Sequence, residues 1–318
     1  LMRKDNTVFF VKQETQENIP IPVNSISDIC VFGELDINKR ALEFLNQNNI
    51  SVHFFNHYEY YVGSYYPRET YNSGLITLKQ AEHYLDENKR LFLAKSFLIG
   101  GIRNMVKNLD YYNRRGKNLS DFIFTIQEKA NVLADVRSIP ELMQIEGSIR
   151  QIYYQAFNEI LNNADFAFDK RTKQPPENPI NALISFGNSL MYITVLTMIY
   201  QTYLDPRIGY LHSTNNRHFT LNLDIAEIFK PVIVDRVIFS LINKNQISLK
   251  HFEKNLDYSY LNEKGKQIFI YEYENKLKDL ITYKKRKVSY KRLIKMECYK
   301  LYKHFIEDEA YIPFLAEW

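Results

Sequence analysis

A long segment without charged side chains, Asn178 to Leu204, constrains the fold of this chain more than any other feature. It is long enough to cross a bilayer. However, polar residues such as Asn181, Ser185 and Thr194 interrupt it, and neither flank carries the basic cluster that marks a membrane span. We therefore expect a buried central helix in a globular protein that makes no membrane contact.

Composition excludes several other classes of protein. The 318 residues are 45% hydrophobic and 25% charged, as is typical of globular domains. The two cysteines, Cys30 and Cys298, belong to no CxxC or Cys/His cluster, so neither a disulfide framework nor a zinc finger is indicated. The N-terminal residues do not read as a signal peptide. A cytoplasmic location is expected.

The first seventy residues have a sequence pattern typical of β-strands. Short runs rich in Val, Ile, Phe and Tyr are separated by polar and proline-containing turns. The runs are Thr7 to Lys12, Ile26 to Gly33, Ser51 to Asn56 and Glu59 to Tyr65. Between the second and third runs, Asn38 can cap a short helix through Leu45. The pattern predicts a small, mostly antiparallel β domain with one helix, over residues 1–72.

Beyond a linker at residues 73–77, the pattern becomes helical. Thr77 and Gln80 form a possible capping box for a helix toward Lys107, and Ser138 with Glu141 forms another for a helix reaching about Leu161. No convincing strand pattern follows. The fold class predicted is therefore α+β with two domains, the second being a large all-α domain over residues 78–318.

The stretch from Gly209 to Pro231 contains the most informative polar residues. His212 stands at the mouth of a polar loop, and the helix expected after that loop carries Asp224 and Glu227. Residues three apart lie on the same helix face. One imidazole with carboxylate oxygens suits Mg²⁺ or Mn²⁺ better than structural zinc. Pro231 should bend or break the helix.

A second acidic element is Glu146-Gly147, four residues before Arg150. An ordinary i,i+4 ion pair with Arg150 would be enough to account for the presence of Glu146 at this position. Gly147 lowers helix propensity, so it suggests that some group approaches the backbone closely at that point. Taken singly, each of these signals is weak.

Taken in order, the motifs resemble the CRISPR-associated spacer-acquisition integrase, the DNA-integrating enzyme of prokaryotic adaptive immunity. They are Glu-Gly at 146–147, Gly-Tyr-Leu-His at 209–212, Leu-Asp-Ile-Ala-Glu-Ile-Phe-Lys-Pro at 223–231 and Val-Asp-Arg at 234–236. The resemblance extends over nearly the whole chain, including residues 181–187 and the terminal Tyr-Ile-Pro-Phe at 311–314.

The resemblance implies a metal site of Glu146, His212 and Glu227, which would be the catalytic residues, with Asp224 as an auxiliary acid. Lys230 stands where the family commonly has arginine, and Glu227 where some members have aspartate. The implied reaction is attack of a DNA 3′-hydroxyl on a phosphodiester at the edge of a CRISPR repeat. The implied cofactor is Mg²⁺ or Mn²⁺.

The resemblance also implies partners. These are double-stranded DNA, as spacer precursor and as CRISPR repeat, and a small ferredoxin-like adaptation protein. The enzyme would act as a homodimer. We expect the β domain to be the dimerisation and partner-contact surface, because small sheets leave edges that can pair. For DNA backbone contacts we expect Arg217 and Lys230, together with a basic segment that includes Lys284, Lys285, Arg286, Lys291 and Arg292.

Two other functions remain open from the sequence. The same residues could serve a nuclease that resolves branched DNA in repair. Alternatively, the basic segment could belong to a non-catalytic nucleic-acid scaffold, which a wide separation of the carboxylates and the imidazole would favour.

Overall fold

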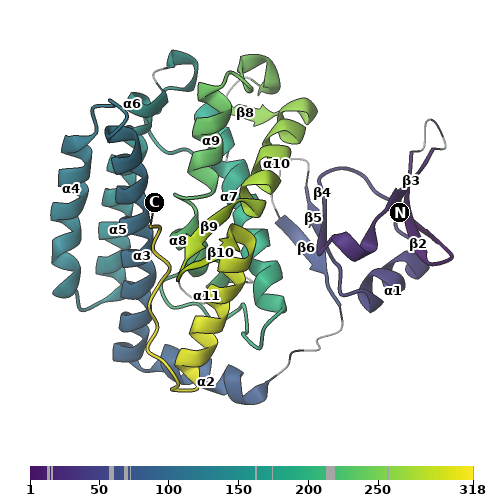
Figure 1. Cartoon of the computed structure of the whole chain (residues 1–318), viewed down its shortest axis with the longest axis horizontal. Helices are drawn as coiled ribbons and strands as arrows, with labels where there is room; N and C mark the ends of the chain where they lie inside the picture. The colour runs from purple at the N-terminus through teal and green to yellow at the C-terminus, as the bar shows by residue number, and fades with distance from the viewer. Residues whose placement is uncertain are drawn as a thin grey trace. The chain divides into compact units, whose positions relative to one another are not determined.

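The structure is a computed structural model of the full chain. It describes all residues except 13–14, 16, 57–60, 68–70, 72, 162, 174, 213–218, 256–257 and 318, and it does not describe the side chains of 254, 255 and 258. The chain divides into two compact units, Leu1–Asn72 and Ser73–Trp318. The element labels below are those of Figure 1.

Among its described residues, the first unit contains two small sheets and one α-helix. The first sheet is the antiparallel set β1 (Met2–Lys4), β2 (Thr7–Val11) and β3 (Asn18–Ile21); the second is β4 (Asp28–Val31), β5 (Ser51–Phe55) and β6 (Tyr61–Tyr65). Strands β4 and β5 pair in parallel, which requires a crossover, and α1 (Lys39–Gln47) lies in it. The Asn38 side chain accepts a hydrogen bond from the Ala41 amide at 2.9 Å, which confirms the predicted cap.

The second unit is mostly helical. Its α-helices are α2 (Gly74–Leu85), α3 (Glu87–Asn113), α4 (Ser120–Asn131), α5 (Ile139–Gln155), α6 (Phe157–Leu161), α7 (Pro179–Tyr200), α8 (Leu221–Phe229), α9 (Val234–Asn243), α10 (Glu263–Lys278) and α11 (Tyr290–Phe305). Figure 1 shows α3, α4 and α5 side by side at one edge of this unit. The predicted fold class, a small β domain followed by a large helical one, is confirmed.

The expectation that the second unit is entirely α-helical was wrong. It contains two antiparallel hairpins, β7 (Phe252–Asn255) with β8 (Tyr258–Leu261) and β9 (Leu280–Tyr283) with β10 (Arg286–Ser289). The turn between β9 and β10 is made by Lys284 and Lys285, whose φ angles are 47° and 64°. Tight hairpin turns usually have glycine or asparagine at positions with positive φ, whereas this turn has two lysines.

The helix expected to begin at Thr77 and to run to Lys107 is two helices. Ser73 caps α2, so the residues predicted as a linker are mostly its first turn. Asp86 separates α2 from α3 and accepts hydrogen bonds from the amides of Asn88 and Lys89, both at 2.9 Å. Gln80 is no capping residue, because it binds the backbone of Asp205.

The charge-free segment forms α7, the core helix of the second unit. Asn178 caps it by accepting from the Asn181 amide at 3.0 Å, and 83% of its most apolar 18-residue window is buried within the protein. This confirms the predicted buried helix. The helix expected to reach about Leu161 is interrupted after Gln155, and Pro231 separates α8 from α9, as predicted.

Candidate functional site

Helix α8 carries the two acidic residues of the candidate site and is buried along its length, apart from the half-buried Leu223. Helix α3 lies directly against its backbone. A Cβ atom at Gly101 would stand 3.0 Å from the Glu227 carbonyl oxygen, so a glycine permits this approach. Asn104, also on α3, donates to the Ile228 carbonyl at 2.8 Å. These contacts fix the position of α8 and therefore of its side chains.

Asp224 is fully buried and holds the preceding loop through its carboxylate. Oδ2 accepts from the amides of Tyr210 and Leu211 at 2.5 and 3.1 Å, and Oδ1 accepts from the His212 amide at 3.0 Å. The His212 ring nitrogen Nδ1 lies 2.7 Å from the same Oδ1. Asp224 thus determines where the loop leaves the core and where His212 stands.

The contact with Asp224 also determines the tautomer of His212. An ionised carboxylate can only accept, so Nδ1 must carry the proton, and the lone pair is then on Nε2. A histidine oriented by a carboxylate in this way is the arrangement found behind metal-ligating histidines. In the structure Asp224 therefore orients His212, while its predicted auxiliary role at a metal site stays a prediction.

Glu227, one turn further on α8, is bound by two cations. Oε1 accepts from Lys230 Nζ at 2.5 Å, and Oε2 forms a short contact with Nη2 of Arg150. Burial opposes ionisation of Glu227, but Arg150 and Lys230 outweigh it and lower the pKa of this carboxyl to about 2. Lys230 in turn donates to the Tyr192 hydroxyl at 2.8 Å. Glu227 is thus a buried carboxylate whose ionised form is favoured by its two cationic partners.

Glu146 reaches the same cation from α5. Its Oε1 atom contacts Nε of Arg150, while Nη2 of that guanidinium contacts Glu227. The simple ion pair between Glu146 and Arg150 is therefore present, but it is part of a bridge between two helices. Two carboxylates that are distant in sequence converge on one positive charge.

The donor atoms at this place fit a divalent cation. Within the described ranges, no three His, Cys, Asp or Glu side chains form a group that could hold a metal ion, and the Arg150 guanidinium contacts both carboxylates. Yet the two carboxylates already share one cation, Arg150, and the Asp224 carboxylate that binds His212 lies one turn before Glu227 on α8. Two hard oxygen donors and one imidazole suit Mg²⁺ or Mn²⁺.

A buried polar network behind the site was missed by the sequence argument. Tyr153 on α5 donates to Asp235 at 2.9 Å and accepts from Asn108 at 2.9 Å. Burial raises the pKa of Asp235 to about 7, against the opposing effects of Tyr153, Arg150 and Lys230. The Val-Asp-Arg motif at 234–236 was the available signal, but a motif does not show which helix an aspartate faces.

Gly147 does not have the close neighbour that we expected from its helical position. A Cβ atom there would meet nothing within 4 Å in the part of the chain that the structure describes. The residue is exposed beside Glu146. A group that closely approaches Gly147 would therefore have to come from outside the described part of the chain.

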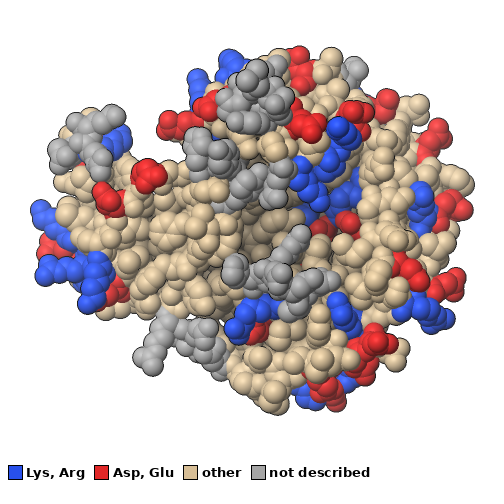
Figure 2. Space-filling model, turned by 180° about the vertical axis from the view of Figure 1, so that it is seen from behind, with Lys and Arg blue, Asp and Glu red and all other residues tan. Residues whose placement is uncertain are grey.

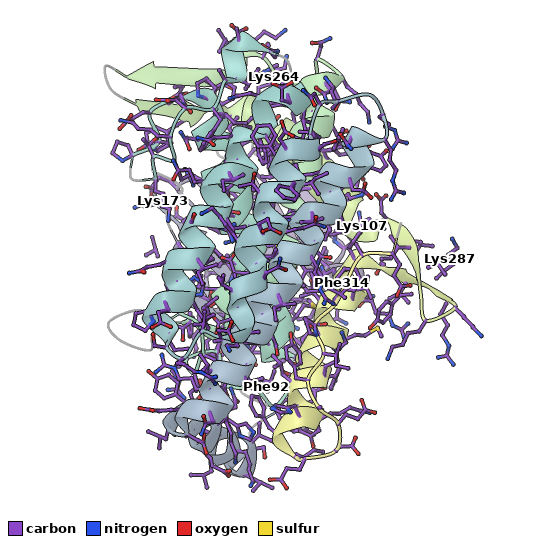
Figure 3. The ribbon with its side chains drawn as sticks, turned by 90° about the vertical axis from the view of Figure 1, so that its left-hand side faces the viewer. Phe92, Lys107, Lys173, Lys264, Lys287 and Phe314 are labelled. Atoms are coloured by element: carbon purple, nitrogen blue, oxygen red, sulfur yellow. The ribbon has the colours of Figure 1, made fainter. Side chains whose placement is uncertain are left out.

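The basic segment expected to contact DNA lies in a domain predicted to be all-α, but it spans a hairpin and a helix. Lys284, Lys285 and Arg286 belong to the exposed β9–β10 hairpin, while Lys291 and Arg292 begin α11. Figure 3 shows Lys287, on this hairpin, and Lys173 at opposite sides of the helical unit. Lys230, expected to grip phosphate, is buried against Glu227, and Arg217 lies outside the described residues.

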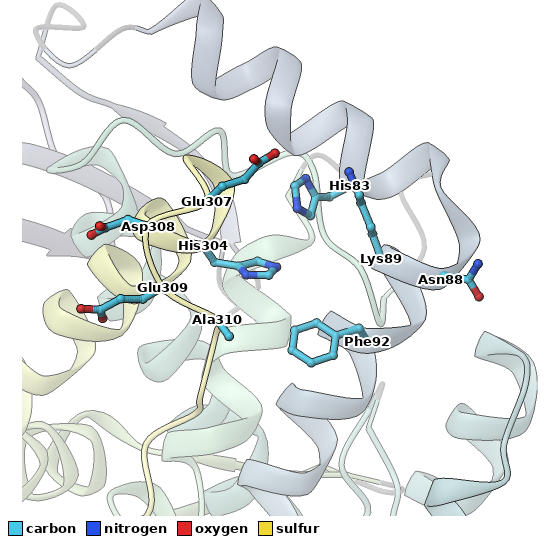
Figure 4. A pocket seen from close by; sticks show the side chains of 9 residues that line it. All are labelled: His83, Asn88, Lys89, Phe92, His304, Glu307, Asp308, Glu309 and Ala310. Atoms are coloured by element: carbon cyan, nitrogen blue, oxygen red, sulfur yellow. The ribbon is translucent and has the colours of Figure 1, made fainter.

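A separate cavity of about 490 Å³ contains none of these residues. Phe92, His83 and His304 lie around it, with the acidic turn of Glu307 and Asp308 at its rim (Figure 4). The candidate site is thus defined by the meeting of α5, α8 and the loop before α8, and not by this cavity.

Known proteins match this chain over nearly its whole length. A family model described as CRISPR associated protein Cas1 matches residues 1–275. The CRISPR-associated endonuclease Cas1 2 of Thermodesulfovibrio yellowstonii is 56% identical over 100% of this chain and 96% of its own length. The structure of a Cas1 protein from Thermotoga maritima superposes with a TM-score of 0.88 at 45% identity, covering 99% of this chain and 96% of that one.

Two more distant structures share the fold. A casposase bound to integration product gives a TM-score of 0.88 at 21% identity, covering 98% of this chain and 89% of that one. A Cas6-RT-Cas1–Cas2 complex gives 0.82 at 20% identity, covering 96% of this chain and 34% of that one.

Proposed function

Because the chain belongs to the Cas1 family of CRISPR-associated proteins, we propose that it is a divalent-metal-dependent DNA strand transferase and endonuclease. It would insert short duplexes into a CRISPR array. The observation that supports this best is the convergence of Glu146 and Glu227 on the single Arg150 guanidinium, with His212 bound by Asp224 one turn before Glu227 on α8.

In the proposed site, Glu146, Glu227 and Nε2 of His212 would hold Mg²⁺ or Mn²⁺. When bound, the ion supplies polarisation of the attacked phosphoryl oxygen and charge stabilisation for the leaving oxygen. Asp224 keeps the His212 ring in one orientation through Nδ1. Lys230, which also donates to the Tyr192 hydroxyl, binds Oε1 of Glu227, whereas Arg150 binds Oε2, so Lys230 would keep the carboxylate in place when Arg150 moves.

The proposed reaction is a direct transesterification. The oxygen of an incoming DNA 3′-hydroxyl forms a bond to phosphorus, and the bond from phosphorus to the 3′-oxygen of the target strand breaks. The attacking hydroxyl gives up its proton to solvent, and the departing 3′-oxygen takes one up. The sequence contains no Ser/His/Asp or Cys/His motif for a covalent intermediate, and the reaction needs none.

A hydrolytic activity of the same site is the second candidate. The relative from Thermodesulfovibrio yellowstonii is named an endonuclease, and water can replace the 3′-hydroxyl as the attacking group. A non-catalytic scaffold is disfavoured, because Glu146 and Glu227 lie on one guanidinium and are not spread through the fold.

We extend the partners to this chain as part of the same proposal. One structural neighbour was solved with Cas2 and another with an integration product. A homodimer bound to DNA and to a small ferredoxin-like protein, acting in the cytoplasm, is the assembly expected here.

The test is a strand-transfer assay with a labelled duplex bearing a free 3′-hydroxyl, supercoiled DNA carrying a CRISPR repeat, Mn²⁺ and the small partner protein. Covalently joined product from the wild-type chain, and none from Glu146→Gln or His212→Asn, is the expected result. Joining by both variants would refute the proposed roles. Cleavage without joining would favour the nuclease.

A further inference from the structure

The buried polar network behind the site joins three helices of the second unit. Asn108 on α3 donates to the Tyr153 hydroxyl of α5 at 2.9 Å, and this hydroxyl donates to Oδ2 of Asp235 on α9 at 2.9 Å. Asn108 also donates to the Pro231 carbonyl, between α8 and α9, at 3.0 Å. The network therefore links α5 to the junction of α8 and α9.

Spacing along α5 places Tyr153 on the same face as the first carboxylate of the site. Glu146, Arg150 and Tyr153 stand at i, i+4 and i+7, so their side chains form one stripe along the helix. Arg150 reaches Glu227 on α8, and Tyr153 reaches Asp235 on α9. Helix α5 is thus tied to the α8–α9 pair at two levels, and the Tyr153 level does not use Arg150.

Helix α3 packs against both α5 and α8 and carries a matching stripe. Gly101, Asn104 and Asn108 stand at i, i+3 and i+7. At the first two positions α3 meets the backbone of α8, and at the third it binds α5 and the α8–α9 junction. One helix therefore holds both of the helices that carry the carboxylates.

The three side chains of the network are enclosed in the core. Asn108 and Tyr153 are fully buried, and Asp235 is 3% exposed. Figure 2 shows, by contrast, basic and acidic side chains next to one another on a face of the helical unit that solvent reaches. Because the network is covered, its effect on a reaction at that surface must pass through the helices that it holds.

Donors and acceptors within the network permit one arrangement of its side chains. The amide nitrogen of Asn108 faces two oxygens, whereas its Oδ1 atom has no partner among the described residues, which fixes the orientation of the amide. Burial raises the pKa of Asp235 to about 7, yet an oxygen of this group can accept from Tyr153 in either ionisation state. Buried hydrogen bonds of this kind make a core rigid and specific.

We propose that Asn108, Tyr153 and Asp235 are positioning residues, which hold α5 at a fixed distance from α8 so that the carboxylates of both helices meet at one metal ion. The hydrogen bond from Tyr153 to Asp235 does not involve Arg150, so it persists when a metal ion takes the place of that guanidinium. This inference rests on the proposed function, because it assigns the residues that keep its two carboxylate ligands together.

Tyr153→Phe tests the network, because it removes one hydroxyl and keeps the ring in the core. Tyr273→Phe is the matched control: its hydroxyl is also buried and lies 2.9 Å from that of Thr194, but it joins α10 to α7. The full-length variants are compared by hydrogen–deuterium exchange without metal, by thermal unfolding, and by kcat and KM for strand transfer at saturating Mn²⁺.

We expect both variants to melt a few degrees below the wild type, since each loses one buried hydrogen bond. Only Tyr153→Phe should speed the exchange of the α5 amides near Glu146, by about five- to tenfold. Only this variant should lower kcat, by about 10–100-fold, because small displacements of catalytic groups cost that much. Its KM for DNA should be unaltered, because the network binds no substrate.

Asp235 provides a second test that does not depend on Tyr153→Phe. Asp235→Asn keeps an oxygen that can accept from Tyr153, so it should retain most of the wild-type kcat. Asp235→Leu has a similar size but no acceptor, so it should lower kcat as much as Tyr153→Phe does.

Wild-type exchange in α5 together with wild-type kcat for Tyr153→Phe would overturn the positioning role, and so would an equal loss of kcat in Tyr273→Phe. The proposed function is tested separately, since exchange without metal requires no joining of DNA. If the wild-type chain joins nothing while Tyr153→Phe loosens α5, only the strand transferase is refuted. If the wild-type chain joins DNA while Tyr153→Phe leaves α5 and kcat unchanged, only the network is refuted.

Discussion

The two acidic residues of α8, Asp224 and Glu227, are held by different kinds of partner. Asp224 accepts from three backbone amides and from the ring of His212, so all its partners belong to the loop that it anchors. Glu227, on the next turn, is bound by Arg150 and Lys230, which are charged groups at the ends of long side chains. Both residues are buried, yet only one depends on exchangeable partners.

This difference separates a structural acid from one that is free to take a new partner. Releasing Asp224 would leave three amides without acceptors, a cost of about 1–3 kcal/mol for each group that stays buried. Releasing Arg150 from Glu227 requires only that another cation take its place. On this account, Asp224 determines the position of the His212 loop, whereas Glu227 is a ligand of the metal ion.

The largest effect is expected from Glu227→Gln, which keeps the shape and removes the charge. Strand transfer should fall at least about a thousandfold, because several kcal/mol of transition-state stabilisation are lost. Stability should also fall by about 3–5 kcal/mol, since Arg150 and Lys230 remain buried with one carboxylate between them. The strand-transfer assay and urea unfolding measure these two losses.

Two further variants keep that prediction interpretable. Adding Lys230→Met to Glu227→Gln removes one surplus charge and should restore part of the stability without restoring strand transfer. Glu128→Gln, on the exposed face of α4, should behave like the wild type in both assays. Activity of Glu227→Gln within tenfold of the wild type would contradict the ligand role.

Asp224→Asn should mainly damage the fold of the loop. The amide brings its own N–H groups toward backbone N–H groups, so unfolding should become easier by about 2–4 kcal/mol. Mn²⁺ should still raise the melting temperature, with an affinity about 10–100-fold weaker, because the His212 ring is no longer oriented. Complete loss of the Mn²⁺ effect would make Asp224 a ligand and remove the contrast with Glu227.

Arg150→Gln tests the contrast between Asp224 and Glu227 by removing the cation that binds Glu227. Without metal the variant should be less stable, because Glu146 and Glu227 then repel each other. With the competing charge gone, the Mn²⁺ concentration for half-maximal stabilisation should fall about tenfold, which corresponds to about 1.4 kcal/mol. Arg114→Gln removes an exposed i,i+4 pair with Asp110 and serves as control. Weaker Mn²⁺ binding by Arg150→Gln would show that Arg150 assists the metal.

The smallest effect is expected from Gly147→Ala, beside Glu146. Because the added methyl meets no described atom within 4 Å, the helix should gain about 0.5–1 kcal/mol in thermal or urea unfolding. Mn²⁺ stabilisation should be unaltered. If strand transfer drops while stability rises, the DNA contacts the protein at Gly147. If stability falls instead, the added methyl group collides with another part of the chain.

The sequence predicted those parts of the fold that local rules determine. Asn38, Ser138 and Asn178 act as helix caps, and Pro231 separates two helices, because each acts on its own neighbours. The β9–β10 hairpin was missed because Lys284 and Lys285 adopt the left-handed conformation without glycine. The break at Asp86 was missed because helix-forming residues flank it on both sides.

The candidate site was predicted as a set of residues but not as a set of contacts. The order of the motifs indicated Glu146, His212, Asp224 and Glu227. Nothing in the sequence showed that Arg150 bridges two of them, or that Asp235 meets Tyr153, because such pairs form only when α5, α8 and α9 pack together. The roles assigned to these residues in catalysis remain predictions.

The most direct test of the exchange between Arg150 and a metal ion is anomalous diffraction from crystals of the full chain soaked in Mn²⁺. The account predicts one strong peak within about 2.0–2.4 Å of Glu146, Glu227 and Nε2 of His212, with Arg150 displaced and the Asp224–His212 contact preserved. Crystals that hold Mn²⁺ elsewhere, or in which Arg150 still bridges both carboxylates at saturating Mn²⁺, would contradict it.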